Sequence, residues 1–198
     1  MEYLFTLNYL LPLEGCDPLQ LVERLGAAGC TDVLVGTGLA GRLALEFSRE
    51  AESAEAALLS ALADIKRIIP EARLVEASPD FVGLSEIAEI VGVSRQNMRK
   101  LMLGHADSFP LAIHEGSASL WHLAEVLSWL DSKGGYALKH PVIEVARVAQ
   151  QVNTAKESQR IGPLSGELVA LLADGVFAWQ PSSDTVYAWL GARLPWRS

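Results

Sequence analysis

Apolar and polar residues alternate with two different periods along the first 80 residues of the chain. Residues 3–11, 31–35 and 72–76 form apolar runs of strand length. In residues 43–48, large apolar side chains alternate with small or polar ones, which is the period of a strand with one solvated face. These four segments are predicted to be β-strands.

Two segments between these strands have the helical period instead. In the first, Asp17 suits a helix cap, Pro18 suits the first helical position, and Gly29 suits the stop. Its predicted inner face comprises Leu19, Val22, Leu25 and Ala28. The second helix is predicted over residues 53–69 and ends at Pro70. Its predicted buried side comprises Ala54, Leu58, Ala61, Leu62 and Ile65.

The resulting order is β-α-β-β-α-β, which indicates an α+β protein whose residues 1–79 form a ferredoxin-like domain. This domain resembles the small regulatory or dimerisation domains of that fold. Turn residues at 78–80 end it and begin a second unit, residues 80–132. Gly134 and Gly135 mark a third, helical region over residues 133–198. That region contains predicted helices at 142–159 and 166–173, followed by Trp179, Trp189 and Trp196.

Residues 84–103 have the pattern of a helix-turn-helix, in which two short helices meet at a tight turn. Ser85 is the expected cap of the first helix. Gly92 provides the turn residue that tolerates a positive φ, and Ser94 caps the second helix. The inward-facing positions of the pair are Ile87, Ala88, Val91, Val93, Met98 and Leu101.

The outer face of the second helix, residues 94–103, is suited to reading DNA in the major groove. It presents Arg95, Gln96, Asn97, Arg99 and Lys100. Arginine pairs with guanine, glutamine and asparagine pair with adenine, and lysine contacts phosphate. An ordinary helical hairpin with a solvated face is the alternative. It is disfavoured because this face has three cations and no acid, whereas solvated faces usually mix both signs.

The segment that follows favours a winged arrangement. Residues 109–117 are predicted to be a strand and a turn, and residues 122–130 resume a helical pattern. Together with the helix-turn-helix, they resemble the excisionase-like branch of the MerR-type winged helices over about 50 residues. The resemblance implies that a hairpin wing contacts the DNA backbone or minor groove. Residues 115–119 contain no Arg or Lys, so His114 and Ser117 are the wing residues expected to contact DNA.

Net charge limits the kind of DNA binding to expect. The whole chain carries −8, with −7 in residues 1–80, −3 in residues 81–131 and +2 in residues 132–198. Broad affinity for nucleic acid depends on neutralising phosphates, which an acidic chain does poorly. A specific reader that uses a few cations and doubles them in a homodimer is expected instead.

Other kinds of chemistry have little support. Residues 36–41 match GxGxxG after a strand, but strand-like residues follow where nucleotide binding needs a helix. Cys16, Cys30 and the four histidines form no metal-binding spacing, and His122 with Glu125 makes an incomplete metal site. No cofactor, metal or enzymatic activity is expected. The absence of a signal peptide and of a long apolar span favours a cytoplasmic protein that does not contact membranes.

These observations predict a dimeric, sequence-specific transcriptional regulator that binds double-stranded DNA. Base contacts are expected from Arg95, Gln96, Asn97 and Arg99, and phosphate contacts from Ser94 and Lys100. Two alternatives remain. One is an antitoxin-like or adaptor module that binds a protein partner and for which DNA binding is secondary. The other is a small-ligand sensor that uses residues 36–41 of the N-terminal domain.

Overall fold

The computed structural model describes residues 1–12, 18–39 and 41–173, and the α+β class is confirmed. Residues 1–157 form one compact unit, and the described residues from 158 to 173 belong to a second. Asp17, Cys16 and the three tryptophans at 179, 189 and 196 lie outside the described residues.

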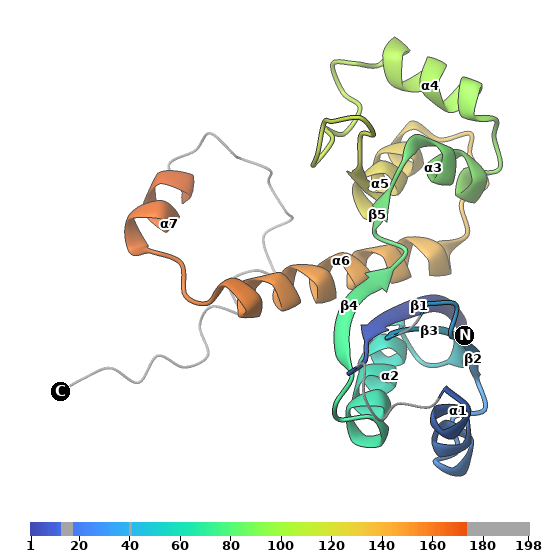
Figure 1. Cartoon of the computed structure of the whole chain (residues 1–198). Coiled ribbons are helices and arrows are strands. Elements are labelled where there is room, and N and C mark those ends of the chain that lie inside the picture. The colour runs from blue at the N-terminus through green and yellow to red at the C-terminus, as the bar shows by residue number, and fades with distance from the viewer. Residues whose placement is uncertain (13–17, 40, 174–198) are drawn as a thin grey trace. The chain divides into compact units, whose positions relative to one another are not determined.

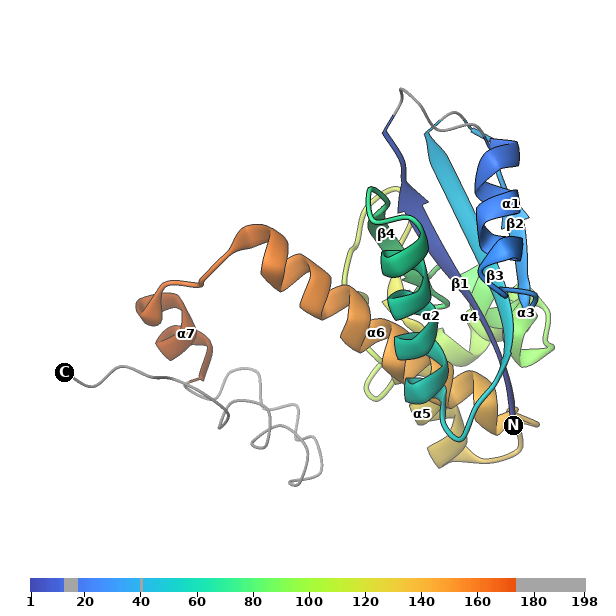
Figure 2. The same ribbon diagram turned by 90° about the horizontal axis from the view of Figure 1, so that it is seen from below.

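The first part of the larger unit is a four-stranded antiparallel sheet with two helices (Figure 1). Its elements are β1 (Glu2–Leu10), α1 (Pro18–Ala27), β2 (Val33–Gly36), β3 (Arg42–Glu50), α2 (Ala54–Ile68) and β4 (Arg73–Ser78). The strands lie in the order β2-β3-β1-β4, so β2 and β4 are the edges. Helices α1 and α2 lie side by side over one face of the sheet (Figure 2).

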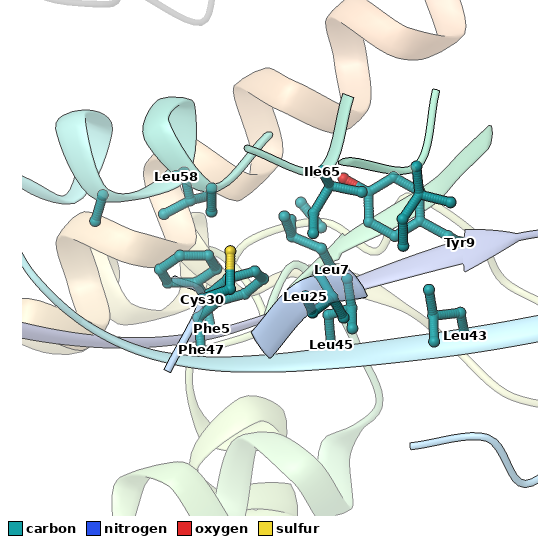
Figure 3. Close-up of a cluster of buried hydrophobic side chains, with 14 of the residues drawn as sticks. Phe5, Leu7, Tyr9, Leu25, Cys30, Leu43, Leu45, Phe47, Leu58 and Ile65 are labelled. Carbon is teal, nitrogen blue, oxygen red and sulfur yellow. The ribbon is translucent and has the colours of Figure 1, made fainter. Parts of the chain in front are cut away.

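The alternation predicted for β3 is present in the structure. Leu43, Leu45 and Phe47 are buried, together with Phe5, Leu7 and other side chains of β1. Figure 3 shows these side chains pointing from the strands toward Leu58 and Ile65 of α2. The opposite face of the sheet exposes Leu4, Leu10 and Leu34, so only one face of the sheet is covered by a core.

The predicted inner face of α1 is partly wrong. Val22 is 45% exposed, whereas Leu21 and Leu25 are buried. These two residues are four apart and lie one above the other on the helix, so they define the inner face. A helix of two to three turns offers few residues to fix its phase, and Val22 and Leu25 fit the helical period almost as well.

The second part of the unit is built from short strands and helices. Its elements are β5 (Phe81–Val82), α3 (Leu84–Val91), α4 (Arg95–Gly104), β6 (Trp121–His122) and α5 (Leu123–Lys133). β5 pairs with β6, and α3 packs against α4. Ile87, Met98, Trp121 and Leu127 belong to a separate hydrophobic core.

Helix α6 (His140–Ile161) contributes to both cores. Val145 and Ala149 pack into the core under the sheet, and Ile143 and Ala146 pack into the core of α3, α4 and α5. The long helix predicted over 142–159 is therefore confirmed, and it connects the two parts of the unit. In the second unit, the predicted helix over 166–173 is confirmed as α7 (Gly166–Ala173).

Candidate nucleic-acid interface

The turn between α3 and α4 is closed by a left-handed glycine. Gly92 has φ 77° and ψ 31°, and the N–H of Val93 donates to the carbonyl of Ala88 at 2.9 Å. This bond is typical of a helix that ends on glycine, which reaches positive φ without strain. Ala88 is buried, and a small side chain there suits the close packing of α3 against α4.

The first helix begins earlier than the sequence predicts. Gly83, not Ser85, is its cap residue, and α3 starts at Leu84. The carboxylate of Glu86 accepts the N–H of Gly83 at 2.7 Å, which is the half of a capping box that the third helical residue supplies.

Two predicted features of the second helix, the cap at its start and the buried residue on its inner face, are confirmed. The Oγ of Ser94 accepts the N–H of Asn97 at 3.2 Å, and Met98 is fully buried. The helix proper runs over Arg95–Gly104, one residue beyond the predicted end. Because Ser94 fixes the entry and Met98 anchors the inner face, the orientation of the outer face is fixed relative to the core.

The predicted reading residues are all exposed on α4. These are Arg95, Gln96, Asn97, Arg99 and Lys100. Arg95 and Arg99 are four residues apart and share one side of the helix, as do Gln96 and Lys100. Gln96, Arg99 and Lys100 line a shallow hollow that also includes Leu103 and Gly104. The exposed face of α4 contains no acidic residue, so nothing on the helix itself neutralises these cations.

The predicted wing is a shorter hairpin than expected. Residues 109–117 do not form a strand, and the pairing is a single bridge between His114 and Leu120. Phe109 is buried instead, and the indole N–H of Trp121 donates to the carbonyl of Pro110 at 3.1 Å. Packing of Phe109 and Pro110 against the core therefore replaces the start of the predicted strand.

His114 and Ser117 are both exposed on this hairpin. A Cβ atom at Gly116 would lie 2.6 Å from Nε2 of His114, so the imidazole folds over the turn. Within the described residues, no hydrogen bond or ion pair joins His114 or Ser117 to α4. The predicted DNA-binding residues of α4 and those of the hairpin therefore lie on two separate surface segments around the same small hydrophobic core.

A buried polar cluster at the junction of the two parts was not predicted. Asp80 and Asn153 are each 1% exposed. Oδ1 of Asp80 lies 2.7 Å from Nδ1 of His122, and Oδ2 of Asp80 accepts Nδ2 of Asn153 at 2.8 Å. The hydrogen bond to the Asp80 carboxylate raises the pKa of His122, which favours its charged form.

Asn153 also forms hydrogen bonds with the backbone of β4, on the side of this edge strand that no other strand pairs with. Its amide accepts the N–H of Ala77 and donates to the carbonyl of Ala77, both at 2.8 Å. Lys156, one turn further along α6, donates to the carbonyl of Val75. The sequence contained one sign of this cluster, because Asn153 follows Val145 and Ala149 on the buried stripe of α6.

The GxGxxG segment joins two strands. Gly36 ends β2 and Gly41 precedes β3, so the loop connects antiparallel neighbours and no helix follows it. In the described residues, no group of three or more His, Cys, Asp or Glu is placed to hold a metal ion. None of the helices described is long and apolar enough to cross a membrane.

Comparison with protein-family models, curated proteins and solved structures gives no match for this chain. The functional argument therefore depends on the residues and geometry described above.

Proposed function

We propose that this protein binds double-stranded DNA in a sequence-specific manner and acts as a dimeric transcriptional regulator. In this proposal, α3 and α4 are a helix-turn-helix, and the hairpin at 114–120 is a reduced wing. Residues 1–79 are a ferredoxin-like domain that regulates the protein or contributes to dimerisation.

The single observation that carries the proposal is the exposed face of α4. Arg95, Arg99 and Lys100 are exposed without an acidic neighbour on the helix, while Met98 on the opposite side is buried. A helix presented in this way offers cations to phosphates and bidentate groups to base edges. A helix face that is only solvated usually mixes charges of both signs, which this face does not.

The net charge of the chain indicates that the α4 surface would bind DNA as a dimer. A net charge of −8 gives little general attraction to DNA, so two copies of α4 would be needed for useful affinity. In a two-fold dimer, the two helices would enter successive major grooves about 34 Å apart. The preferred site would then be a palindrome with half-sites separated by about one helical turn.

Selection of bound sequences from random duplex DNA by the full chain tests this proposal. The expected result is enrichment of a palindrome, with discrimination that persists as salt is raised. Failure to enrich any sequence at low salt would contradict the proposal and favour a protein-binding role. The buffer salt must be fixed and stated, because affinity for DNA depends strongly on it.

A further inference from the structure

The two edges of the sheet differ in how their backbone groups are satisfied. On β4, the outward N–H and carbonyl of Ala77 bond to Asn153, and the carbonyl of Val75 accepts from Lys156. Helix α6 thus occupies that edge. An open strand edge offers a template for another chain, and proteins usually cover or interrupt it.

The other edge, β2, has no such cover. The N–H of Ser48 donates to the carbonyl of Asp32 at 2.9 Å, so residue 32 faces β3. Because facing and outward residues alternate in an antiparallel pair, Leu34 also faces β3, while Val33 and Val35 direct their backbone groups outward. Within the described residues, nothing outside the sheet bonds to the backbone of Val33 or Val35.

The sheet surface beside this edge is apolar with an acidic border. Leu4 and Leu34 are 63% and 69% exposed and line a shallow hollow together with Glu46 and Ser48. Glu46 is the register partner of Leu34, and Glu2 pairs with Glu50 on the same face. Asp32 is already neutralised by Arg49 at 2.6 Å, so Glu46 is the acid that remains beside the hollow.

We propose that the β2 edge binds an extended segment of a partner polypeptide that adds as a fifth strand. The backbone of Val33 and Val35 would bond to the added strand, and the apolar side chains of the segment would lie beside Val33 and Val35 on the face that carries the core. The basic side chains at the alternate positions would lie on the opposite face, where their alkyl stems cover Leu34 and their charged ends approach Glu46. This binding site lies outside the α4 surface and does not depend on DNA binding.

A second copy of this chain fits the edge poorly. Strand pairing between two copies would bring together two segments of net charge −7. Like charges facing each other across an interface oppose association, whereas a basic segment is attracted. The dimer of the proposed regulator would therefore use another surface.

The test uses the full chain with two labelled peptides of about ten residues, one alternating Val with Lys and the other Val with Glu. Val35→Pro removes an outward N–H, and proline is tolerated at such edge positions. Glu46→Lys reverses the acidic border. Glu55→Lys, at an exposed acid in the first turn of α2, is the matched control. Thermal unfolding of each variant shows whether its fold is intact.

The expected result is that the Lys peptide binds the parent about tenfold more tightly than the Glu peptide. Val35→Pro and Glu46→Lys should each weaken binding of the Lys peptide about tenfold, while Glu55→Lys binds like the parent. Equal binding of the Lys peptide by the parent, Val35→Pro and Glu46→Lys would overturn the proposal. Conversion of a dimer to a monomer by Val35→Pro, measured by sedimentation, would also overturn it, because a second copy would then occupy the edge.

Discussion

Asn153 and Asp80 are 73 residues apart in the chain, yet their side chains share a buried hydrogen bond of 2.8 Å. Through it, α6 is joined to the segment between β4 and β5, and the second oxygen of Asp80 continues the contact to His122. The junction between the sheet and the α3–α4 unit is therefore fixed by polar groups as well as by apolar packing.

Replacing Asn153 by alanine should destabilise the protein by about 2 kcal/mol. The substitution leaves the backbone of Ala77 and one oxygen of Asp80 buried without their partner, which is more costly than losing an exposed hydrogen bond. Urea unfolding followed by circular dichroism measures the change. Gln151→Ala, at an exposed position of the same helix, should change the free energy of unfolding by less than about 0.5 kcal/mol. Equal stability of Asn153→Ala and the parent would show that the cluster is not structurally important.

Stability should also depend on the charge of His122. The pKa of this histidine is raised above its ordinary value of 6.5, chiefly by its hydrogen bond to Asp80. The stabilisation is therefore fully present below about pH 6.5 and is lost as pH rises through the raised folded-state pKa.

The free energy of unfolding, measured from about pH 6 to pH 9, should fall more steeply for the parent than for His122→Gln. His114→Gln, on the exposed hairpin, serves as the control and should follow the parent. Parallel curves for the parent and His122→Gln would exclude a contribution from the His122–Asp80 pair.

The turn at Gly92 gives a further prediction. With φ at 77°, an alanine there would adopt the left-handed region, at a cost of roughly 1–2 kcal/mol. Gly92→Ala should lower the midpoint of thermal unfolding, whereas Gly104→Ala at the end of α4 should not. No Cβ contact would hinder either alanine, so the difference would come from backbone conformation alone.

Lys100 should influence affinity without influencing specificity. A lysine that contacts phosphate releases about one counterion, so Lys100→Ala should reduce the salt dependence of DNA binding by about one unit of slope per protomer, or roughly two for the proposed dimer. Binding isotherms for one duplex at several salt concentrations provide the slope. Lys66→Ala on α2 is a suitable comparison, since it removes the same charge from outside the α3–α4 unit. A slope unchanged by Lys100→Ala would remove this residue from the interface.

Local patterns predicted most of the elements, and the errors have identifiable physical causes. Ser94, Met98 and the exposed face of α4 follow from helix periodicity and capping, which depend on neighbouring residues only. The prediction of Ser85 as the cap is wrong because α3 already begins after Gly83, where Glu86 accepts the backbone N–H of the cap residue.

Features that depend on contacts between distant segments were not predictable. The cluster of Asp80, His122 and Asn153 unites residues from three separate segments, and no local spacing reports it. The hairpin at 114–120 is short because Phe109 packs into a core whose position the sequence does not give. The sequence pattern therefore predicted the exposed residues of α4 but not the buried cluster of Asp80, His122 and Asn153.

The central claim is that α4 reads DNA, and the double variant Arg95→Ala/Arg99→Ala tests it most directly. The measurement is the dissociation constant for the selected duplex and for a scrambled duplex at fixed salt. Each arginine that pairs with guanine should contribute roughly 1–3 kcal/mol per half-site, so the variant should lose most of its preference for the selected sequence. Arg73→Ala, on β4, should retain it. If the double variant binds the selected duplex as tightly and as selectively as the parent, α4 is not the reading helix.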